Sequence, residues 1–374
     1  MTGLESGLAK ANASTGSGFG SCPLDPWLAR QCGAATCPEL PARLAQMQLH
    51  LLRCTLEQAV RSTFYANRLQ GRNLKLETLE DLPCLPFTTA QDLRNWGDFL
   101  CVSRGDVQRM VTLHTSGTTG QPKRLAFTDA DLARTRDFFA VGMSQLVRAG
   151  QRLAVLLPGA ERPDGVADLL RQALGTAGVE VVAPPPHVHM DRCGEELARW
   201  LGQAAAHCVV AAPAQLASLL TFFPTAGPDN LAGVLSSAEP LDADLGQILR
   251  QRWQCEVLDH YGLTETAYGG AVECSAHDGF HVRELDVFIE IVDISRGNVL
   301  PFGQAGEVVI TTLQREAMPL VRYRTGDVAR LLPGPCACGS PLQRLGPVLG
   351  RIERPEGASP RIVCPSKGRG WQDC

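Results

Sequence analysis

The stretch that decides the fold class begins with the apolar run RLAVLL at 152–157. A loop containing proline and glycine follows it, then a helix-like segment at 166–176 and a second apolar run, VEVVA, at 179–183. The same alternation continues with a helix at 195–205, HCVVAA at 207–212, a helix at 215–222, and short strands at 234–236 and 256–258. Strands that alternate with helices at this spacing predict an α/β fold, with a mainly parallel sheet flanked by helices.

The pattern changes on both sides of this stretch. Upstream, leucines at helical spacing predict helical structure over 40–72, and Asp129–Ala130–Asp131 suits the start of a helix reaching about residue 150. Downstream of residue 270, the runs VFIEIVD (287–293), GEVVITT (306–312) and VARLL (328–332) predict a smaller β-rich subdomain. We therefore expect a partly disordered tail at 1–38, an α/β domain at 39–270, a β-rich subdomain of the same domain at 271–350, and an end segment at 351–374.

Composition excludes several classes of protein. The 374 residues are 44% hydrophobic and 20% charged, with a net charge of −4, which argues against a general nucleic-acid binder. There is no apolar run of the roughly 18 residues that a membrane span needs, and the N-terminus lacks the features of a signal peptide. We expect a cytoplasmic protein whose 14 cysteines are mostly reduced thiols.

The sharpest motif is TSGTTGQPK at 115–123. Its glycines free the backbone, its hydroxyls are hydrogen-bond donors, and Lys123 adds positive charge, so the loop is suited to phosphate oxygens. It differs from a P-loop, because Pro122 and Arg124 flank the lysine. The phosphate-binding candidates are Thr115, Ser116, Gly117, Thr118, Thr119, Gly120 and Lys123.

Two further motifs are weaker on their own. DHYGLTE at 259–265 offers Glu265 as a ligand for Mg²⁺ and Tyr261 as a flat face for a base, but it also fits a plain strand end and loop. YRTGD at 323–327 offers Asp327 to ribose hydroxyls, but it also fits a tight turn between strands.

Together these motifs resemble the adenylate-forming (AMP-binding) enzyme superfamily. TSGTTGQPK, Ala238–Glu239–Pro240, YGLTE, YRTGD and Gly350–Arg351 follow one another in the order of that superfamily. Phe64–Tyr65 and DLPCLPFTTAQDLR at 81–94 are similar to the phenylacetate–CoA ligase family, with Ala90 where that family has lysine. The resemblance runs from about residue 40 to residue 352.

The resemblance implies roles for individual residues. Residues 115–123 would hold the ATP phosphates, and Lys123, Thr264 and Glu265 would act in catalysis, with Thr264 at the α-phosphate and Glu265 on Mg²⁺. Asp327 and Arg351 would contact the ribose. The adenine would lie against Ala238, Glu239, Pro240, Asp259, His260 and Tyr261.

The resemblance also implies the large N-terminal domain of these enzymes and their reaction. A small carboxylic acid would react with ATP to give acyl-AMP, and CoA would then take the acyl group. Neither a nucleic acid nor a membrane is an expected partner, and a homodimer is the assembly that the resemblance suggests.

Four residues are candidates for a zinc site. Cys336 and Cys338 lie in a loop rich in proline and glycine, and Cys274 and His281 lie upstream, with His277 as a competing ligand. Three thiolates and one imidazole would form a closed, structural Zn²⁺ site, and related phenylacetate–CoA ligase-like chains share both elements. The alternative is a pair of surface cysteines in a turn.

The sequence departs from the family in two places. Complete members continue after the Gly–Arg hinge into a mobile C-terminal domain, whereas residues 352–374 form a short, basic tail. Such a chain would act with a domain from a separate chain, stop at the adenylate or use another acceptor, or bind nucleotide without turnover. In addition, LLPGAER at 156–162 replaces an aromatic, glycine-rich stretch of the family, which argues against an aryl acid.

Overall fold

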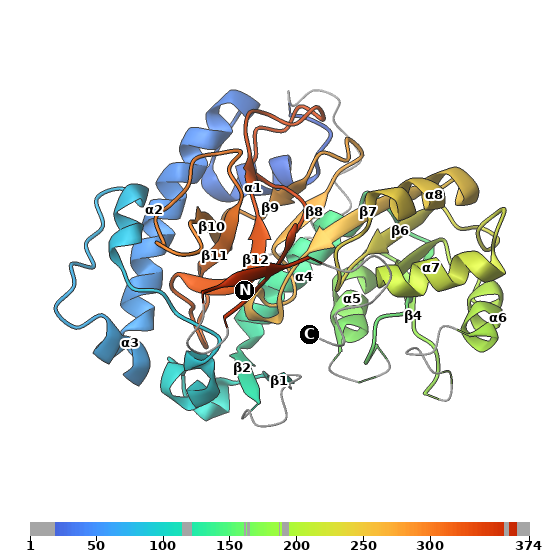
Figure 1. Ribbon diagram of the computed structural model, residues 1–374. Helices are drawn as coiled ribbons and strands as arrows, with labels where there is room; N and C mark the ends of the chain where they lie inside the picture. The colour runs from blue at the N-terminus through green and yellow to red at the C-terminus, as the bar shows by residue number, and fades with distance from the viewer. Residues whose placement is uncertain are drawn as a thin grey trace, which may run out of the picture.

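Two β-sheets of different construction organise the chain (Figure 1). The computed structural model describes residues 19–113, 122–160, 162, 165–186, 188, 194–354 and 359–364. Among these residues, no helix combines the length and the apolarity needed to cross a membrane.

The larger sheet has nine strands in the order β13-β14-β9-β8-β7-β6-β5-β3-β4. Its parallel part contains β3 (Arg152–Val155), β4 (Glu180–Val182), β5 (Cys208–Ala211), β6 (Gly233–Ser236) and β7 (Glu256–Tyr261). Its antiparallel part contains β8 (Ala271–Glu273), β9 (Phe280–Val282), β13 (Leu331–Leu332) and β14 (Arg344–Leu345). The α/β class and the mainly parallel strands around 152–258 are confirmed.

Alternate side chains of the parallel strands enter two cores. Leu153 and Val155 join the core that includes α4 (Asp129–Met143) and α5 (Val166–Gly175). Ala154 joins the core on the opposite face, with α6 (Glu195–Gln203), α7 (Pro213–Phe222) and α8 (Ala243–Trp253). Because both faces are covered, the middle of these strands is apolar, and their charged or ionisable residues lie near the strand ends, such as Arg152 and Glu180 at the starts of β3 and β4 and Asp259 and His260 near the end of β7.

The smaller sheet is antiparallel, with five strands in the order β10-β11-β12-β15-β16. They are β10 (Val287–Val292), β11 (Gly306–Thr312), β12 (Tyr323–Ala329), β15 (Gly350–Glu353) and β16 (Arg361–Val363). The long α2 (Leu40–Ala59) and the short α3 (Thr63–Arg68) lie on this side of the molecule in Figure 1, and α4 lies between the two parts. A two-stranded pair, β1 (Arg109–Leu113) and β2 (Lys123–Phe127), brackets the TSGTTGQPK segment.

Several boundaries differ from the sequence expectations. Leu24–Cys32, within the expected tail, forms helix α1, whose Leu24 and Leu28 are fully buried. The large sheet continues past residue 270 into β8 and β9, and strands β15 and β16 extend the small sheet beyond residue 350. The YRTGD segment is not a tight turn: it forms most of β12, where Gly326 has a φ of +80° and the register against β11 shifts.

Candidate functional site

A cavity of about 780 Å³ lies where α4 and α5 face the carboxyl ends of the parallel strands. Val210 of β5, Leu235 of β6 and His260 of β7 line it, together with residues that directly follow β6 and β7. In open α/β sheets, ligands bind outside the carboxyl ends of the strands, so this is the expected place for a site. The predicted site residues that line the cavity are Lys123, Ala238, His260, Thr264, Glu265 and Arg351.

Glu265 lies in the short 3-10 turn Thr264–Thr266, which follows β7, and it is buried. Its Oε1 atom is 3.0 Å from the Lys123 Nζ atom and accepts a hydrogen bond of 2.9 Å from the Tyr323 hydroxyl. Burial opposes the charged form, but the Lys123 ammonium and the hydrogen bonds hold the pKa of Glu265 below its ordinary value. The site therefore presents an ionised carboxylate beside a cation.

Asp327 brings three of the predicted residues together. Its Oδ1 atom accepts a hydrogen bond of 3.1 Å from the Arg351 Nε atom, and its Oδ2 atom accepts one of 3.0 Å from the Tyr261 hydroxyl. The pairing of β12 with β15 places Asp327 opposite Arg351. Burial raises the pKa of Asp327, although Arg351 and Tyr261 favour its charged form. The two sheets are thus joined next to the cavity by one carboxylate.

Asp259 and His260 face different surroundings. The Asp259 carboxylate accepts hydrogen bonds from the backbone N–H groups of Leu241 and His260, and burial raises its pKa to about 7. The His260 Nδ1 atom lies 3.2 Å from the Ser237 hydroxyl, and burial, with Arg283 nearby, lowers the pKa of His260 to about 4. The His260 side chain is therefore neutral at pH 7 and lines the cavity. The Asp259 carboxylate is instead hydrogen-bonded to backbone N–H groups.

Other predicted residues flank the cavity. Ala238 has a φ of +76°, a left-handed conformation that a residue with a side chain rarely adopts, and the half-buried Glu239 and Pro240 follow it. Leu113 and Lys123, the paired ends of β1 and β2, both line the cavity. Thr115, Ser116, Gly117, Thr118, Thr119 and Gly120 lie outside the described residues.

Several residues of the site were not predicted from the sequence. Tyr323 lies in YRTGD without a predicted role of its own, yet its hydroxyl donates a hydrogen bond to Glu265. The apolar wall from α4 and α5 includes Phe138, Phe139 and Leu170. These residues have no motif of their own, and only the packing of α4 and α5 against the sheet brings them to the cavity.

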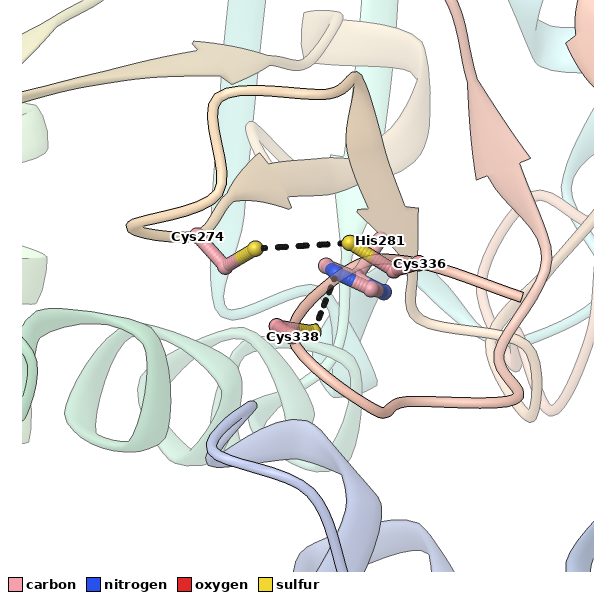
Figure 2. Close-up of side chains that lie close together, drawn as sticks. All are labelled: Cys274, His281, Cys336 and Cys338. Carbon is pink, nitrogen blue, oxygen red and sulfur yellow. Dashed lines mark hydrogen bonds between the residues drawn. The ribbon is translucent and has the colours of Figure 1, made fainter.

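A second cluster holds the four candidate zinc ligands (Figure 2). The ligand atoms of Cys274, His281, Cys336 and Cys338 all lie within 4.8 Å of one another. The Cys274 and Cys336 sulfurs are 3.8 Å apart, and the Cys338 Sγ atom is 3.5 Å from the His281 Nε2 atom. Figure 2 shows the four side chains pointing toward a common centre.

The surroundings of this cluster distinguish the two candidate histidines. His281 is fully buried, and burial, with Arg344 nearby, lowers its pKa to about 4, so the imidazole is neutral as metal binding requires. His277, the competing ligand, instead lies beside two carboxylates, 3.1 Å from Glu256 and 3.5 Å from Glu273. Cys336 is buried as well, which disagrees with the alternative of two surface cysteines.

Comparison with known proteins gives related sequences and related structures. The AMP-binding enzyme family matches residues 108–314. The phenylacetate-coenzyme A ligase of Pseudomonas putida is 31% identical over 335 residues, which cover 83% of this chain and 71% of that protein. The enzyme of the same name from Thermus thermophilus is 32% identical over 283 residues, covering 74% of this chain and 62% of that protein.

Among solved structures, a 2-hydroxyisobutyryl-CoA ligase in complex with 2-HIB-AMP and CoA has a similar fold. Its TM-score is 0.71 at 20% sequence identity, and the similarity covers 83% of this chain and 69% of that one.

Proposed function

Since the chain belongs to the AMP-binding enzyme family, with phenylacetate–CoA ligases among its relatives, we propose that it activates a carboxylic acid with ATP and transfers the acyl group to CoA. In the first step, a carboxylate oxygen forms a bond to the α-phosphorus, and the bond from that phosphorus to the pyrophosphate oxygen breaks. In the second step, the CoA thiol forms a bond to the acyl carbon, and AMP leaves as the thiol gives up its proton.

The observation that supports this proposal is the convergence of separate motifs on one cavity. Lys123, the adjacent Thr264 and Glu265, and Arg351 come from three distant parts of the chain and line the same space, and Arg351 is hydrogen-bonded to Asp327. In-line displacement at phosphorus is catalysed chiefly by positioning and by charge neutralisation. A cavity with two cations and few acid–base groups suits that chemistry.

We assign Mg²⁺ to Glu265. The carboxylate is ionised, and the Lys123 ammonium and the Tyr323 hydroxyl both donate hydrogen bonds to its Oε1 atom. Mg²⁺ is commonly bound through one or two carboxylates together with substrate phosphates, so this donor set fits the ion. When bound, the ion would neutralise phosphate charge. Lys123 would orient Glu265, and Tyr323 would keep its carboxylate fixed.

The experiment is acid-dependent exchange between ATP and pyrophosphate over a panel of acids, followed by a thioester assay with CoA. Exchange and thioester formation together support the proposal. Exchange without thioester would show an enzyme that stops at the adenylate or uses another acceptor, and nucleotide binding with neither would show a binding protein without turnover.

Glu265→Gln sharpens this experiment. It removes the charge that would hold Mg²⁺, so we expect Mg²⁺-dependent exchange to fall by at least about tenfold. Glu57→Gln, on the exposed face of α2, is the matched control and should behave as the wild type. Unchanged exchange in Glu265→Gln would refute the role given to this carboxylate.

We further propose that Cys274, His281, Cys336 and Cys338 bind a structural Zn²⁺. Three sulfurs and one neutral imidazole nitrogen within 4.8 Å match a tetrahedral Cys₃His donor set, which leaves no open position for a substrate. The test is metal analysis of the purified protein. About one zinc per chain is expected, and the Cys336→Ser/Cys338→Ser protein should have lost it. Wild-type protein that is purified without zinc would contradict the proposal.

A further inference from the structure

One part of the cavity is lined by residues outside the predicted nucleotide-binding set. Among the described residues that line it, the charged side chains are Lys123, Glu265 and Arg351, all from the predicted nucleotide set. The walls from α4, α5 and the strands are apolar: Phe138, Phe139, Met143, Leu170, Val210 and Val272. A charged group placed against these walls would be desolvated without a partner, so this part suits an uncharged, apolar group.

Gly142 lies at this apolar wall, one turn after Phe138 and Phe139 on α4. A Cβ atom built on Gly142 would meet one atom within 4 Å, the Val272 Cγ1 atom at 3.7 Å, which is an ordinary contact. Since Val272 also lines the cavity, a side chain at position 142 would project into the cavity rather than into packed core. The absence of a side chain at this position therefore adds directly to the space.

Helix propensity does not favour this glycine. Gly142 is the second-last residue of the 15-residue helix α4, where alanine would form the helix better and would fit without a clash. The helix itself therefore does not require a glycine at position 142. The glycine is explained by the space that it leaves in the cavity next to Val272.

We propose that Gly142 is a specificity-determining residue, which leaves room for the bulky, uncharged, apolar body of the carboxylic acid. The proposal rests on the proposed function, because it assigns the cavity to the acyl-adenylate. It makes the acid an apolar monocarboxylic acid, with an alkyl or aryl body that reaches the wall formed by Phe138, Gly142 and Val272.

The test uses unreactive acyl-adenylate mimics, so that it does not depend on turnover. Acylsulfamoyl adenosines that carry acetyl, succinyl, hexanoyl and phenylacetyl groups are titrated by calorimetry into the wild type and into Gly142→Ala, Gly142→Leu and Gly202→Leu. Gly202 of α6 is the control, since it is an exposed helical glycine with open space around it and lies away from the cavity.

We expect the wild type to bind the hexanoyl or the phenylacetyl mimic at least about tenfold more tightly than the acetyl or succinyl mimic. The tighter of the two shows whether the body is alkyl or aryl. Gly142→Leu should weaken binding of that mimic by about tenfold or more and leave the acetyl mimic within about threefold, while Gly202→Leu changes neither.

Gly142→Ala keeps the experiment informative if the leucine variant does not fold. It should keep or raise the melting temperature and should weaken only the bulky mimics. An equal effect of Gly142→Leu and Gly142→Ala on all mimics, or no effect on any, would overturn the role of Gly142. If the wild type binds neither AMP nor the acetyl mimic, the proposed function itself fails.

Discussion

Glu284 is a buried carboxyl group that joins α2 to the segment between β9 and β10. It accepts a hydrogen bond of 2.8 Å from the Gln343 backbone N–H group, and the side-chain amide of the buried Gln48 donates to its backbone carbonyl at 3.0 Å. Burial raises the pKa of Glu284 from its ordinary value of 4.5 to about 7. In the unfolded chain the same group ionises near 4.5, so between these two values the folded protein holds a proton that the unfolded chain has lost.

Stability should therefore fall as the pH rises from about 4.5 to about 7, and Glu284 should contribute about 3 kcal/mol to this loss. Glu284→Gln keeps the shape but does not titrate, so its free energy of unfolding should fall less steeply over the same range. Urea unfolding of both proteins at pH 5, 6, 7 and 8 measures the difference. Burial also raises the pKa of Asp259, which is not among the groups that shift the pKa of Glu284 and titrates in both proteins, so parallel curves would contradict the assignment to Glu284.

Single residues of the candidate site could be predicted when they belonged to a contiguous motif. Lys123, Glu265 and Asp327 each stand in a short motif, but only the order of the motifs, through the family resemblance, implied the roles of Glu265 and Asp327. The structure brings Lys123 and Glu265 into contact at 3.0 Å. Gly142 and Tyr323 could not be predicted in this way. Gly142 matters because it leaves space next to Val272. Tyr323 matters because its hydroxyl donates a hydrogen bond to Glu265, which lies 58 residues earlier in the chain.

The turn that follows β7 has an unusual backbone geometry. Ala267 and Tyr268 are consecutive non-glycine residues in the left-handed region, with φ values of +56° and +66°. Such residues persist only where their surroundings hold them. The buried Thr135 of α4 donates a hydrogen bond of 3.0 Å to the Ala267 carbonyl, and the Tyr268 N–H group donates to the Leu263 carbonyl at 2.9 Å. Helix α4 thus holds the turn that carries Glu265.

Thr135→Val keeps the side-chain volume but removes the donor, leaving the Ala267 carbonyl without this bond. We expect a loss of about 1–2 kcal/mol in the free energy of unfolding and Mg²⁺-dependent ATP binding that is several-fold weaker, because Glu265 is then less firmly placed. Thr135→Ser should restore both.

Thr55→Val is the matched control for this experiment. Thr55 is a buried helical threonine on α2 whose hydroxyl has no hydrogen-bond partner among the residues that the structure describes, so its removal should cost little. Unfolding in urea and calorimetric titration with Mg·ATP give the two readouts. Equal losses in the Thr55 and Thr135 variants would show that the hydrogen bond to Ala267 does not matter.

Helices and strands could be predicted best where short apolar runs alternated regularly with segments of helical pattern. The alternation over 152–258 predicted the parallel strands and helices α5, α6 and α7 to within a few residues, since strands buried on both faces are largely apolar, but it did not predict α8. Helix α1 was not predicted, because the Gly-, Ser- and Ala-rich start of the chain indicated a tail, and the alternative interpretation of YRTGD as a tight turn is wrong. Gly326 does not end β12. It lies where the pairing of β12 with β11 shifts in register, and such a shift cannot be recognised from the sequence of β12 alone.

For the whole molecule, the four-residue Cys/His cluster connects parts of the chain that are distant in sequence. The loop that carries Cys336 and Cys338 also receives the N-terminal segment: the Ser21 N–H group donates to the Cys338 carbonyl at 3.1 Å, and the Ser340 hydroxyl donates to Asp25 at 2.5 Å. Gly20 lies so close to this loop that an added Cβ atom would be 2.7 Å from the Cys338 carbonyl oxygen. The shape of the loop therefore decides whether α1 can dock.

If zinc holds that loop in shape, its removal should loosen α1 and leave the cavity intact. In the Cys336→Ser/Cys338→Ser protein, amide hydrogen exchange of Leu24–Cys32 should become at least about tenfold faster, as expected when a docked element opens locally. Binding of the acyl-adenylate mimics should stay within about threefold, because none of the four ligands lines the cavity. The control is Cys54→Ser/Cys84→Ser, two exposed cysteines outside the cluster, which should exchange as the wild type does. A zinc-free variant in which α1 exchanges at the wild-type rate would show that the hydrogen bonds of Ser21 and Asp25 hold α1 without the metal, and the cluster would then have no part in joining the N-terminal segment to the β-rich subdomain.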